Sequence, residues 1–497
     1  MPRPAATLAA GQGAGGGDTE AARRAAVFSI VGILLVTLAA KLWLAWRFEG
    51  FLSGDDLEIV QAAARVAIGL RYDPWVLRCL FHPIVLAAPF VKLAWLLGTR
   101  DPDVLTWAAA IPTVLFSTAA IGLTAALARR FGLSWRASVA AAFFEAFAWM
   151  PLAYGASPYP RPISTALLLA AFLLATSPRP GLLHPLTAGV LAGAAFAVRW
   201  SEGVVLVPLL AAPLLLRSSA PPLPHRRIAA IAGGFAAGTL LTAGVTDWLT
   251  WGWPLRSLWE YFRIMFLERK GVEDQPFWDY PYTILHWAGP ILVLLLIPAW
   301  KERRARLAIA FFAAIVLLMS LFSHKEWRYL QAAIPFLAIA AAAGWERLWI
   351  GGGTSRFLAA VALVLAVPYG VERTVSLLSN RSAAGLETSR FIQSLEPRPR
   401  NLAFVQEWAF GEHLYLGNDV EIREIEISRP LRPDAIRTAA AGADVAAVYA
   451  LLLDDAGRRK FESLGFREIG RFKKRRSYEC VVFGRGAWSA PRPGTLP

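Results

Sequence analysis

Long apolar blocks, separated by short polar stretches, recur along most of the chain. A membrane-spanning helix needs about 20 apolar residues, so blocks near this length predict helices that cross a bilayer. Twelve blocks qualify, at 27–46, 79–97, 104–128, 137–153, 162–177, 183–198, 203–216, 228–246, 283–300, 307–323, 330–345 and 357–371. The pattern therefore predicts an all-α polytopic membrane protein.

Both ends of the chain depart from this pattern. Residues 1–25 are rich in Gly and Ala and have no periodicity that could bury a core, so we expect a disordered cytoplasmic tail before a membrane domain at 26–375. Residues 380–497 have the composition of a soluble domain. Strand-like segments at 401–407, 444–452 and 478–484, with an amphipathic helix at 454–466, predict a small α/β domain there.

Composition and charge agree with this division. The 497 residues are 56% hydrophobic and 18% charged, whereas soluble domains average about 45–50% apolar and about 25% charged residues. A net charge of +15 would suggest a nucleic-acid partner for a soluble protein. Basic cytoplasmic loops explain this charge in a membrane protein, so we expect no nucleic acid. The two cysteines imply neither a disulfide framework nor a metal cluster.

Loop charge orients the predicted bundle. Basic segments at 129–136, 217–227 and 301–306, with the N-terminal tail, should lie in the cytoplasm. The loops at 47–78 and 247–282, with the C-terminal domain, are then expected on the opposite face. Strict alternation through twelve helices would return the C-terminus to the cytoplasm. Either one block, with 79–97 as the first candidate, does not cross or one helix is missed, and we expect 11 to 13 helices.

The loop at 47–78 carries the first chemically suggestive residues. Asp55, Asp56 and Glu58 follow the first apolar block almost directly. A carboxylate that is partly desolvated at a membrane surface can serve as a general base toward a hydroxyl. The alternative is structural, because Asp55 and Asp56 could cap a helix that begins at Leu57.

A denser cluster follows the block at 307–323. His324, Lys325, Glu326 and Arg328 lie within five residues, on the face away from the basic loops. Lys and Arg side chains there could bind a phosphate, or could be interfacial anchors. Further anion-binding candidates on the same face are Arg161 and Arg199. The aromatic loop that begins at Asp247 could be an interfacial belt or a platform for sugar rings.

The run from His324 to Tyr329, HKEWRY, resembles the HKE-x-R-[FY] signature of the family-22 GT-C mannosyltransferases of the ALG and PIG types, which use polyprenyl-phosphate-mannose. Asp55-Asp56 resembles the acidic pair in the first luminal loop of that family, and Arg78 resembles the arginine that opens its next helix. Arg161-Pro162-Ile163-Ser164 is similar to its Arg-x-x-Ser segment. Arg199, and Asp247 with Trp251-Gly252, resemble two further elements.

The resemblance covers roughly residues 47–335, with departures. Asp56 stands where the family usually has Glu, Trp200-Ser201 replaces Pro-Thr, and the C-terminal domain lies outside the resemblance. The composition suggests a bacterial member. The resemblance implies an inverting glycosyltransferase of the GT-C fold that moves a sugar, expected to be mannose, from a polyprenyl phosphate to an acceptor hydroxyl.

The resemblance also implies roles for the site residues. Asp55, with Asp56 as its rival, would be the catalytic base. Binding of the donor phosphate is expected from His324, Lys325, Arg328, Arg199 and Arg161. Other substrate contacts are expected from Glu58, Arg78, Asp247, Glu326 and Tyr329. No cofactor is implied, although Asp55, Asp56 and Glu58 could hold a divalent cation.

The expected partners are the lipid-linked donor, membrane lipid, and an acceptor that could be a glycan, a glycolipid or a protein. The expected location is the inner membrane of a bacterium, with the active site and C-terminal domain in the periplasm. Two alternatives stay open at this point. One is a GT-C transferase for another sugar, such as arabinose or aminoarabinose, and the other is a lipid or sugar transporter.

Overall fold

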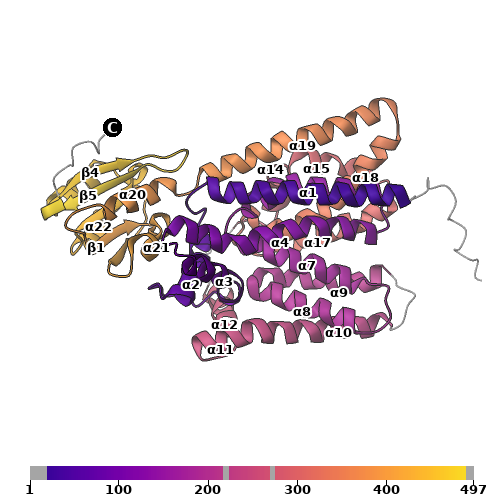
Figure 1. Cartoon of the computed structure of the whole chain (residues 1–497), viewed down its shortest axis with the longest axis horizontal. Coiled ribbons are helices and arrows are strands. Elements are labelled where there is room, and N and C mark those ends of the chain that lie inside the picture. Colours follow the sequence, from indigo (N-terminus) through magenta and orange to yellow (C-terminus); the bar gives the residue numbers. More distant parts are fainter. Residues whose placement is uncertain (1–19, 217–222, 269–274, 489–497) are drawn as a thin grey trace, which may run out of the picture.

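The computed structural model describes residues 20–216, 223–268 and 275–488. Helices form an elongated bundle, and a small domain with a sheet lies at one end of it (Figure 1). The bundle contains α1 (Glu20–Arg47), α4 (Pro102–Arg130), α5 (Trp135–Phe147), α6 (Trp149–Tyr154), α7 (Arg161–Ala175), α8 (Leu183–Val198), α9 (Leu206–Leu215), α10 (Pro224–Thr239), α17 (Arg303–Ser320), α18 (Ile334–Ile350) and α19 (Gly353–Ser379).

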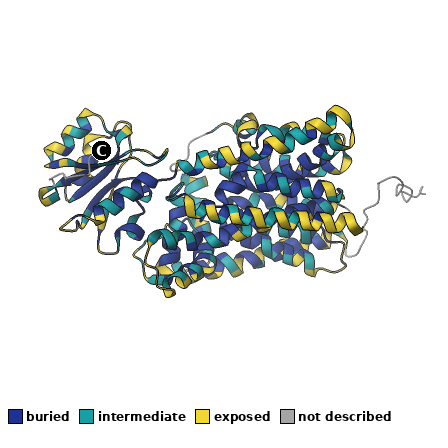
Figure 2. Ribbon diagram, turned by 45° about the horizontal axis from the view of Figure 1, so that its top comes forward, coloured by how far each residue is buried: buried dark blue, intermediate teal, exposed yellow. Residues whose placement is uncertain are grey.

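Several of these helices are long and apolar enough to cross a membrane. Within the described residues, five segments meet both conditions, at Glu20–Arg47, Pro102–Arg130, Pro224–Trp251, Trp327–Ile350 and Gly353–Gln393, and shorter apolar helices accompany them. Large apolar residues such as Phe28 and Leu35 of α1 are exposed. Figure 2 shows many exposed residues along the outer helices of the bundle. Such a surface suits lipid, and the predicted polytopic membrane fold is confirmed.

Small residues bring α8 and α10 into close contact. A Cβ atom at Gly189 or Gly193 of α8 would collide with the backbone of α10, and one at Gly234 or Gly238 of α10 would collide with the backbone of α8. Helices in lipid associate through such close contacts between small residues, because the hydrophobic effect does not drive helices together within a bilayer.

The block at 79–97 does not cross the bundle. Arg475 of the C-terminal domain donates to the Arg47 carbonyl at the end of α1 at 2.7 Å, and Arg390 of the same domain contacts Asp103 at the start of α4. The chain between these helices therefore starts and finishes at one end of the bundle. It forms α2 (Gly54–Ile68), a π-helical turn (His82–Ala87) and α3 (Ala88–Leu96), and α3 lies beside α2 at that end (Figure 1).

This finding resolves the conflict in the predicted topology, and 79–97 is the first candidate that the sequence offered for a non-crossing block. The start of α1 and the C-terminal domain lie at opposite ends of the bundle (Figure 1), as an odd number of crossings requires. At the end away from that domain, two predicted basic loops meet, because Arg304 donates to the Gly132 carbonyl at 2.6 Å.

The block at 283–300 was predicted as one helix and is instead broken into short pieces. These are α13 (Asp279–Tyr282), α14 (Ile284–Trp287), α15 (Pro290–Leu294) and α16 (Leu296–Ala299). Pro290 and Pro298 lack the backbone N–H that a continuous helix needs. Gly289, at φ +87°, adopts a left-handed conformation between two of the pieces.

Two further elements extend the bundle toward the C-terminal domain. A π-helical turn (Leu240–Gly244) joins α10 to α11 (Val245–Trp251), and α12 (Arg256–Phe262) follows after a turn with Gly252 at φ +74°. A 3-10 helix (Trp200–Val205) precedes α9, and another (Trp327–Ala333) precedes α18.

The described part of the C-terminal domain forms a five-stranded mixed sheet in the order β2-β1-β3-β5-β4. Its strands are β1 (Asn401–Val405), β2 (Glu421–Ile425), β3 (Val445–Tyr449), β4 (Phe466–Phe472) and β5 (Cys480–Arg485), with helices α20 (Ala383–Gln393), α21 (Glu412–Leu416), α22 (Pro433–Ala440) and α23 (Asp455–Ser463). β1 pairs in parallel with β2 and β3, whereas β5 pairs antiparallel with β3 and β4. β1, β3, β5 and α23 lie where the sequence pattern predicts them.

Polar contacts join this domain to the bundle beside α2. Lys474 bonds to Glu49 at 2.9 Å, and Arg390 and Tyr415 both contact Asp103. The Phe51 amide donates to the Ser382 hydroxyl at 3.1 Å. These contacts place one side of the C-terminal domain directly over the first turn of α2.

Candidate active site

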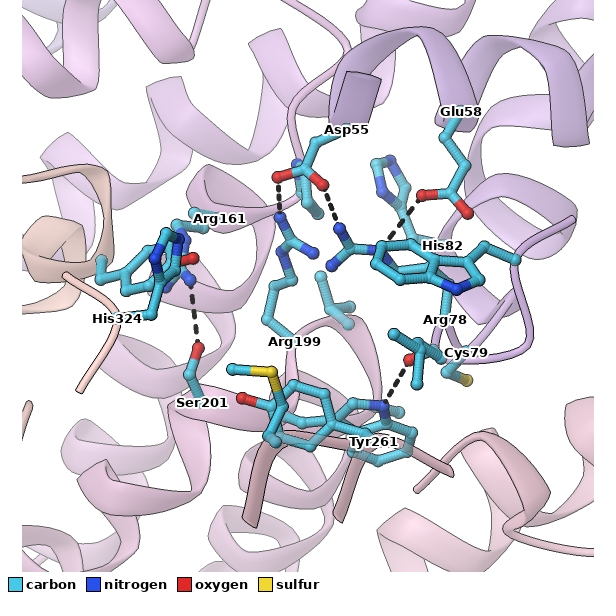
Figure 3. Close-up of a pocket in the computed structure, with 18 of the residues that line it drawn as sticks. Asp55, Glu58, Arg78, Cys79, His82, Arg161, Arg199, Ser201, Tyr261 and His324 are labelled. Carbon is cyan, nitrogen blue, oxygen red and sulfur yellow. Dashed lines mark hydrogen bonds and ion pairs between the residues drawn. The ribbon is translucent and has the colours of Figure 1, made fainter. Parts of the chain in front are cut away.

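The first turn of α2 decides the direction of its two aspartates. Ser53 is the N-cap, and the Asp56 carboxylate accepts the backbone N–H of Ser53 at 2.9 Å and that of Leu52 at 2.8 Å. This reciprocal capping box satisfies donors that the start of a helix otherwise leaves unpaired. Asp56 is fully buried and faces the backbone. Asp55, one residue earlier, faces the cavity shown in Figure 3.

Asp55 lies among cationic side chains from three distant parts of the chain. Its carboxylate contacts Arg78, which follows α2, and Arg199, which follows α8. Arg328, from the 3-10 helix before α18, approaches it at 3.4 Å, and the Tyr159 hydroxyl donates to it at 3.2 Å. The Asp55 side chain is only 9% exposed.

The charge around Asp55 controls its ionisation. Burial alone would raise the pKa of this carboxyl, but the positive charges of Arg78, Arg328 and Arg161, with the Tyr159 hydrogen bond, outweigh burial and hold the pKa below its usual range. Asp55 is therefore ionised at neutral pH. Arg78, Arg199 and Arg328 all contact this one carboxylate, so an incoming anion would compete with it for them.

Arg161 is a further arginine at the cavity and has its own partners. At the start of α7, it donates to Glu202 at 2.9 Å and to the Ser201 hydroxyl at 3.1 Å. Its guanidinium lies 4.1 Å from the centre of the Tyr329 ring. The charge and orientation of Arg161 are therefore fixed before any ligand enters.

These residues line a cavity of about 830 Å³ that has both charged and apolar walls. Figure 3 shows Asp55 and Glu58 above Tyr261, with Arg78 and Arg199 between them. The apolar lining includes Ile264, Met265, Phe266, Leu321 and Phe322. A cavity of this size and composition fits a ligand with an anionic head and a hydrocarbon tail.

Glu58 extends the charged wall along α2. Its carboxylate accepts a hydrogen bond from Arg78 at 3.1 Å, and the Tyr72 hydroxyl also interacts with it. Burial, supplemented by the negative charge of Asp55, raises the pKa of Glu58 to about 7, although Arg78 opposes the shift. Glu58 is therefore a group that can change protonation near neutral pH.

A second cavity, of about 550 Å³, lies on the other side of this wall. It shares Asp55, Glu58, Trp75, Arg78 and Arg328 with the first cavity, which we call the bundle cavity. Its remaining walls come from α2, from the loop after α2 and from the C-terminal domain, so we call it the interdomain cavity. Asp55 is thus accessible from two compartments.

Most of the predicted site residues line the bundle cavity, and three do not. Asp55, Glu58, Arg78, Arg161, Arg199, His324, Glu326, Arg328 and Tyr329 all line the bundle cavity. His324 lies 3.3 Å from Glu326, which also contacts Arg328. The sequence alone had grouped these residues only by their expected side of the membrane.

Asp56, Lys325 and Asp247 lie elsewhere in the structure. Lys325 is nearly buried and donates to the carbonyls of Gln275 at 2.9 Å and Phe322 at 2.5 Å. Asp247 accepts the Ser257 amide at 2.9 Å and the Ser257 hydroxyl at 2.5 Å, and so closes the turn between α11 and α12. None of the three is among the described residues that line the bundle cavity.

Sequence reasoning missed several residues at the site. Tyr159 and Glu202, which position Asp55 and Arg161, each lie within three residues of a predicted arginine, and this proximity was the available signal. His82 also lines the bundle cavity, and neither of its ring nitrogens has a hydrogen-bond partner among the described residues. Its position after an apolar run gave no such signal.

The acidic residues of α2 do not converge on a common point that could hold a cation. Asp55 and Glu58 share Arg78, while Asp56 binds backbone amides. In the part of the chain that the structure describes, no group of His, Cys, Asp or Glu side chains is arranged to hold a metal ion.

Substitution of Asp56 by Ala should destabilise the protein more than it impairs the site. The change would leave the Leu52 and Ser53 amides without acceptors, which costs about 1–3 kcal/mol of unfolding free energy for a buried group. Thermal unfolding in detergent would show a lower Tm. An unchanged Tm would contradict the capping role of this carboxylate.

Comparison with known proteins agrees with this geometry. The model of the Alg9-like mannosyltransferase family matches residues 73–409, more than half of the chain. No curated protein sequence matches. Among solved structures, ArnT from Cupriavidus metallidurans in the apo state aligns with a TM-score of 0.65 at 16% identity, covering 95% of this chain and 100% of that one.

The same ArnT bound to undecaprenyl phosphate aligns with a TM-score of 0.64 at 15% identity, covering 94% of this chain and 99% of that one. At these identities the likeness shows the fold, and it extends over the bundle and the C-terminal domain together. The predicted GT-C fold and glycosyltransferase class are thereby confirmed. This chain belongs to the Alg9-like mannosyltransferase family.

Proposed function

We propose that this protein transfers mannose from a polyprenyl-phosphate donor to an acceptor hydroxyl, with inversion at the anomeric carbon. The observation that carries the proposal is the position of Asp55, which lies between an arginine-lined amphipathic cavity and a second, polar cavity. The family match supports mannose as the sugar. The undecaprenyl phosphate bound to a protein of the same fold supports the lipid carrier.

The charged and apolar walls of the bundle cavity set the orientation of the donor. Its phosphate would lie at Arg78, Arg199 and Arg328, where planar guanidinium groups can bind two phosphate oxygens at once. Its prenyl chain would follow the apolar wall near Phe266 and Phe322. The arginines would leave Asp55 as they turn to the phosphate, and the pKa of Asp55 would rise toward the range of an ordinary carboxyl.

The reaction then needs one base and one stabilised leaving group. The acceptor oxygen attacks the anomeric carbon and gives its proton to Asp55, as the bond from that carbon to the phosphate oxygen breaks. Polyprenyl phosphate leaves with the electron pair, and the arginines stabilise its added negative charge. Transfer of a proton to a positioned carboxylate typically contributes about 10²–10⁴-fold to the rate.

We further propose that the site faces the periplasm of a bacterial inner membrane. The supporting observation is the grouping of the basic loops at the end of the bundle opposite to α2 and the C-terminal domain. Basic loops stay preferentially on the cytoplasmic side.

Transfer of label tests this function. Purified protein would be mixed with radiolabelled polyprenyl-phosphate-mannose and a membrane extract as acceptor source. We expect label in a product that no longer partitions as donor, and no such product from heat-inactivated protein. Transfer from polyprenyl-phosphate-aminoarabinose or polyprenyl-phosphate-arabinose, but not from the mannose donor, would reject mannose. Failure with all three donors would reject the proposed function.

Donor binding should strengthen as the pH falls through about 7, the pKa of Glu58. The raised pKa means that Glu58 takes up a proton on the acid side of neutrality and releases Arg78 from their ion pair. One added positive charge near the phosphate should lower the donor Kd about fivefold, the effect of roughly 1 kcal/mol. Equilibrium binding of polyprenyl-phosphate-mannose would measure this change, because its phosphodiester does not titrate near neutral pH.

Glu58→Gln is the matched variant for the pH experiment. The amide introduced at this position does not take up a proton near neutral pH, so the donor Kd of this variant should be independent of pH in this range. If the pH dependence of the wild type persists in the variant, another group is responsible for it.

A further inference from the structure

The interdomain cavity differs in charge from the bundle cavity. Its lining contains several carboxylates, from both the bundle and the C-terminal domain. These are Asp55, Glu58, Asp73, Glu407, Glu412 and Glu421. The basic side chains in the same lining are Arg71, Arg78, Arg328 and His413.

Most of this positive charge is already neutralised. Arg78 pairs with Asp55 and Glu58, Arg328 pairs with Asp55 and Glu326, and Arg71 pairs with Glu421 at 2.9 Å on the exposed rim. In contrast, no ion pair among the described residues involves Glu407 or Glu412. The C-terminal domain therefore contributes uncompensated negative charge to this cavity.

The two carboxylates lie close enough to affect each other and the α2 wall. Burial, followed by the charge of Glu407, raises the pKa of Glu412 to about 7, and Glu58 adds to this shift. Burial also raises the pKa of Glu407. Carboxylates that repel one another in a partly closed space favour a cation or a hydrogen-bond donor between them.

An unpartnered polar atom points to a ligand at the same place. Gln61 of α2 is fully buried and lines the cavity, and its amide oxygen makes no hydrogen bond in the described structure. The other end of this amide interacts with Glu412, where hydrogen bonding to Gln61 lowers the pKa of the carboxyl. Native proteins rarely leave such groups unsatisfied.

Aromatic rings complete the wall. Tyr72 and Trp75 come from the loop after α2, and Trp408 comes from the C-terminal domain. The Trp75 side chain is 54% exposed. Flat aromatic faces beside hydrogen-bonding amides and carboxylates bind the faces and hydroxyl groups of sugar rings.

We propose that the interdomain cavity binds the acceptor, and that the acceptor end that enters it is a carbohydrate without phosphate or carboxylate, bound more tightly when it bears a protonated amine. This inference rests on the proposed function. The uncompensated carboxylates repel an anionic head group and attract an ammonium group, while the sugar hydroxyls reach Asp55 through the shared wall. The two substrates would thus meet at Asp55 from cavities of opposite charge.

Three mannosides that differ only in their aglycone test this preference. Their aglycones would be 2-aminoethyl, propyl and 2-carboxyethyl, and calorimetry would measure their binding to the full-length protein in nanodiscs at neutral pH. We expect the aminoethyl compound to bind about tenfold more tightly than the carboxyethyl compound. The propyl compound should lie between them. Equal or tighter binding of the carboxyethyl compound would overturn the proposal.

Variants locate the preference in the cavity. The double variant Glu407→Gln/Glu412→Gln should lose most of the difference, because both side chains keep their shape but not their charge. Glu426→Gln, an exposed carboxylate outside the cavity lining, should keep the full difference. If Glu426→Gln lost the difference while the double variant kept it, the cavity would not be the binding site.

The same samples separate this inference from the proposed function. Binding of undecaprenyl phosphate should be unchanged in the double variant, which also shows that it folds. Mannose transfer to acceptors with an anionic end, by an enzyme that uses the lipid donor normally, would overturn only the acceptor class. An aminoethyl preference that depends on Glu407 and Glu412, without use of any polyprenyl-phosphate sugar, would support the charged site and overturn the proposed function.

Discussion

Asp55→Asn should lower the rate of sugar transfer by about 10²–10⁴-fold, the usual contribution of a positioned general base. The amide has nearly the shape of the carboxylate but cannot accept the proton of the attacking hydroxyl. The helix that carries it should be undisturbed, because the capping box of α2 depends on Ser53 and Asp56. Single-turnover transfer of labelled mannose would measure the loss.

Donor binding is the control that separates loss of the base from loss of donor affinity. In the variant, one negative charge no longer competes for Arg78, Arg199 and Arg328. Its Kd for undecaprenyl phosphate should therefore be the same as, or lower than, that of the wild type. A variant with weaker donor binding and an unaltered chemical step would assign Asp55 to donor binding rather than to proton transfer.

Arg328→Ala should reduce kcat/KM by about 10²–10³-fold, the range seen when one donor to a developing negative charge is removed. Arg328 donates to Ser53 at 3.0 Å, approaches Asp55, and lies 5.3 Å from the centre of the Tyr159 ring. Its guanidinium is therefore already held where the leaving phosphate would gain charge. Steady-state kinetics with saturating and limiting donor would separate kcat from KM.

Lys325→Met is the matched comparison, because the two cations are three residues apart. The Lys325 ammonium bonds to the carbonyls of Gln275 and Phe322, so its loss should lower the Tm while the folded enzyme keeps most of its kcat. A normal Tm with a kcat as low as that of Arg328→Ala would return Lys325 to the donor phosphate, as the sequence motif suggests.

Much of the site could be predicted from the sequence because charge is rare and costly in such an apolar chain. The arginines at 161, 199 and 328 stand out against their surroundings for this reason. Composition cannot determine which of two adjacent residues faces a cavity. The capping box turns Asp56 toward the backbone and leaves Asp55 facing the cavity. Likewise, Lys325 bonds to the Phe322 carbonyl, whereas Arg328 reaches Ser53 at the cavity.

The fold, too, could be predicted from the sequence only in part. Hydropathy over a fixed length finds apolar helices but cannot distinguish a helix that crosses the bundle from one that lies beside α2. Only the strict alternation of the loops indicated that 79–97 does not cross. The edge strands β2 and β4 were missed because charged residues such as Arg423 and Glu468 interrupt their apolar alternation. Their strand conformation is stabilised by pairing with β1 and β5, which are distant in sequence.

The interdomain cavity has a consequence for the order in which this protein matures. Its walls come from distant parts of the chain, and one of the contacts that join them, between Asp103 and Arg390, links residues 287 positions apart. A chain synthesised from its N-terminus contains α2 and Asp55 long before the ribosome has made Trp408 or Glu412. Asp55 therefore lies on the nascent chain without the interdomain cavity, which is complete only after the C-terminal domain has folded.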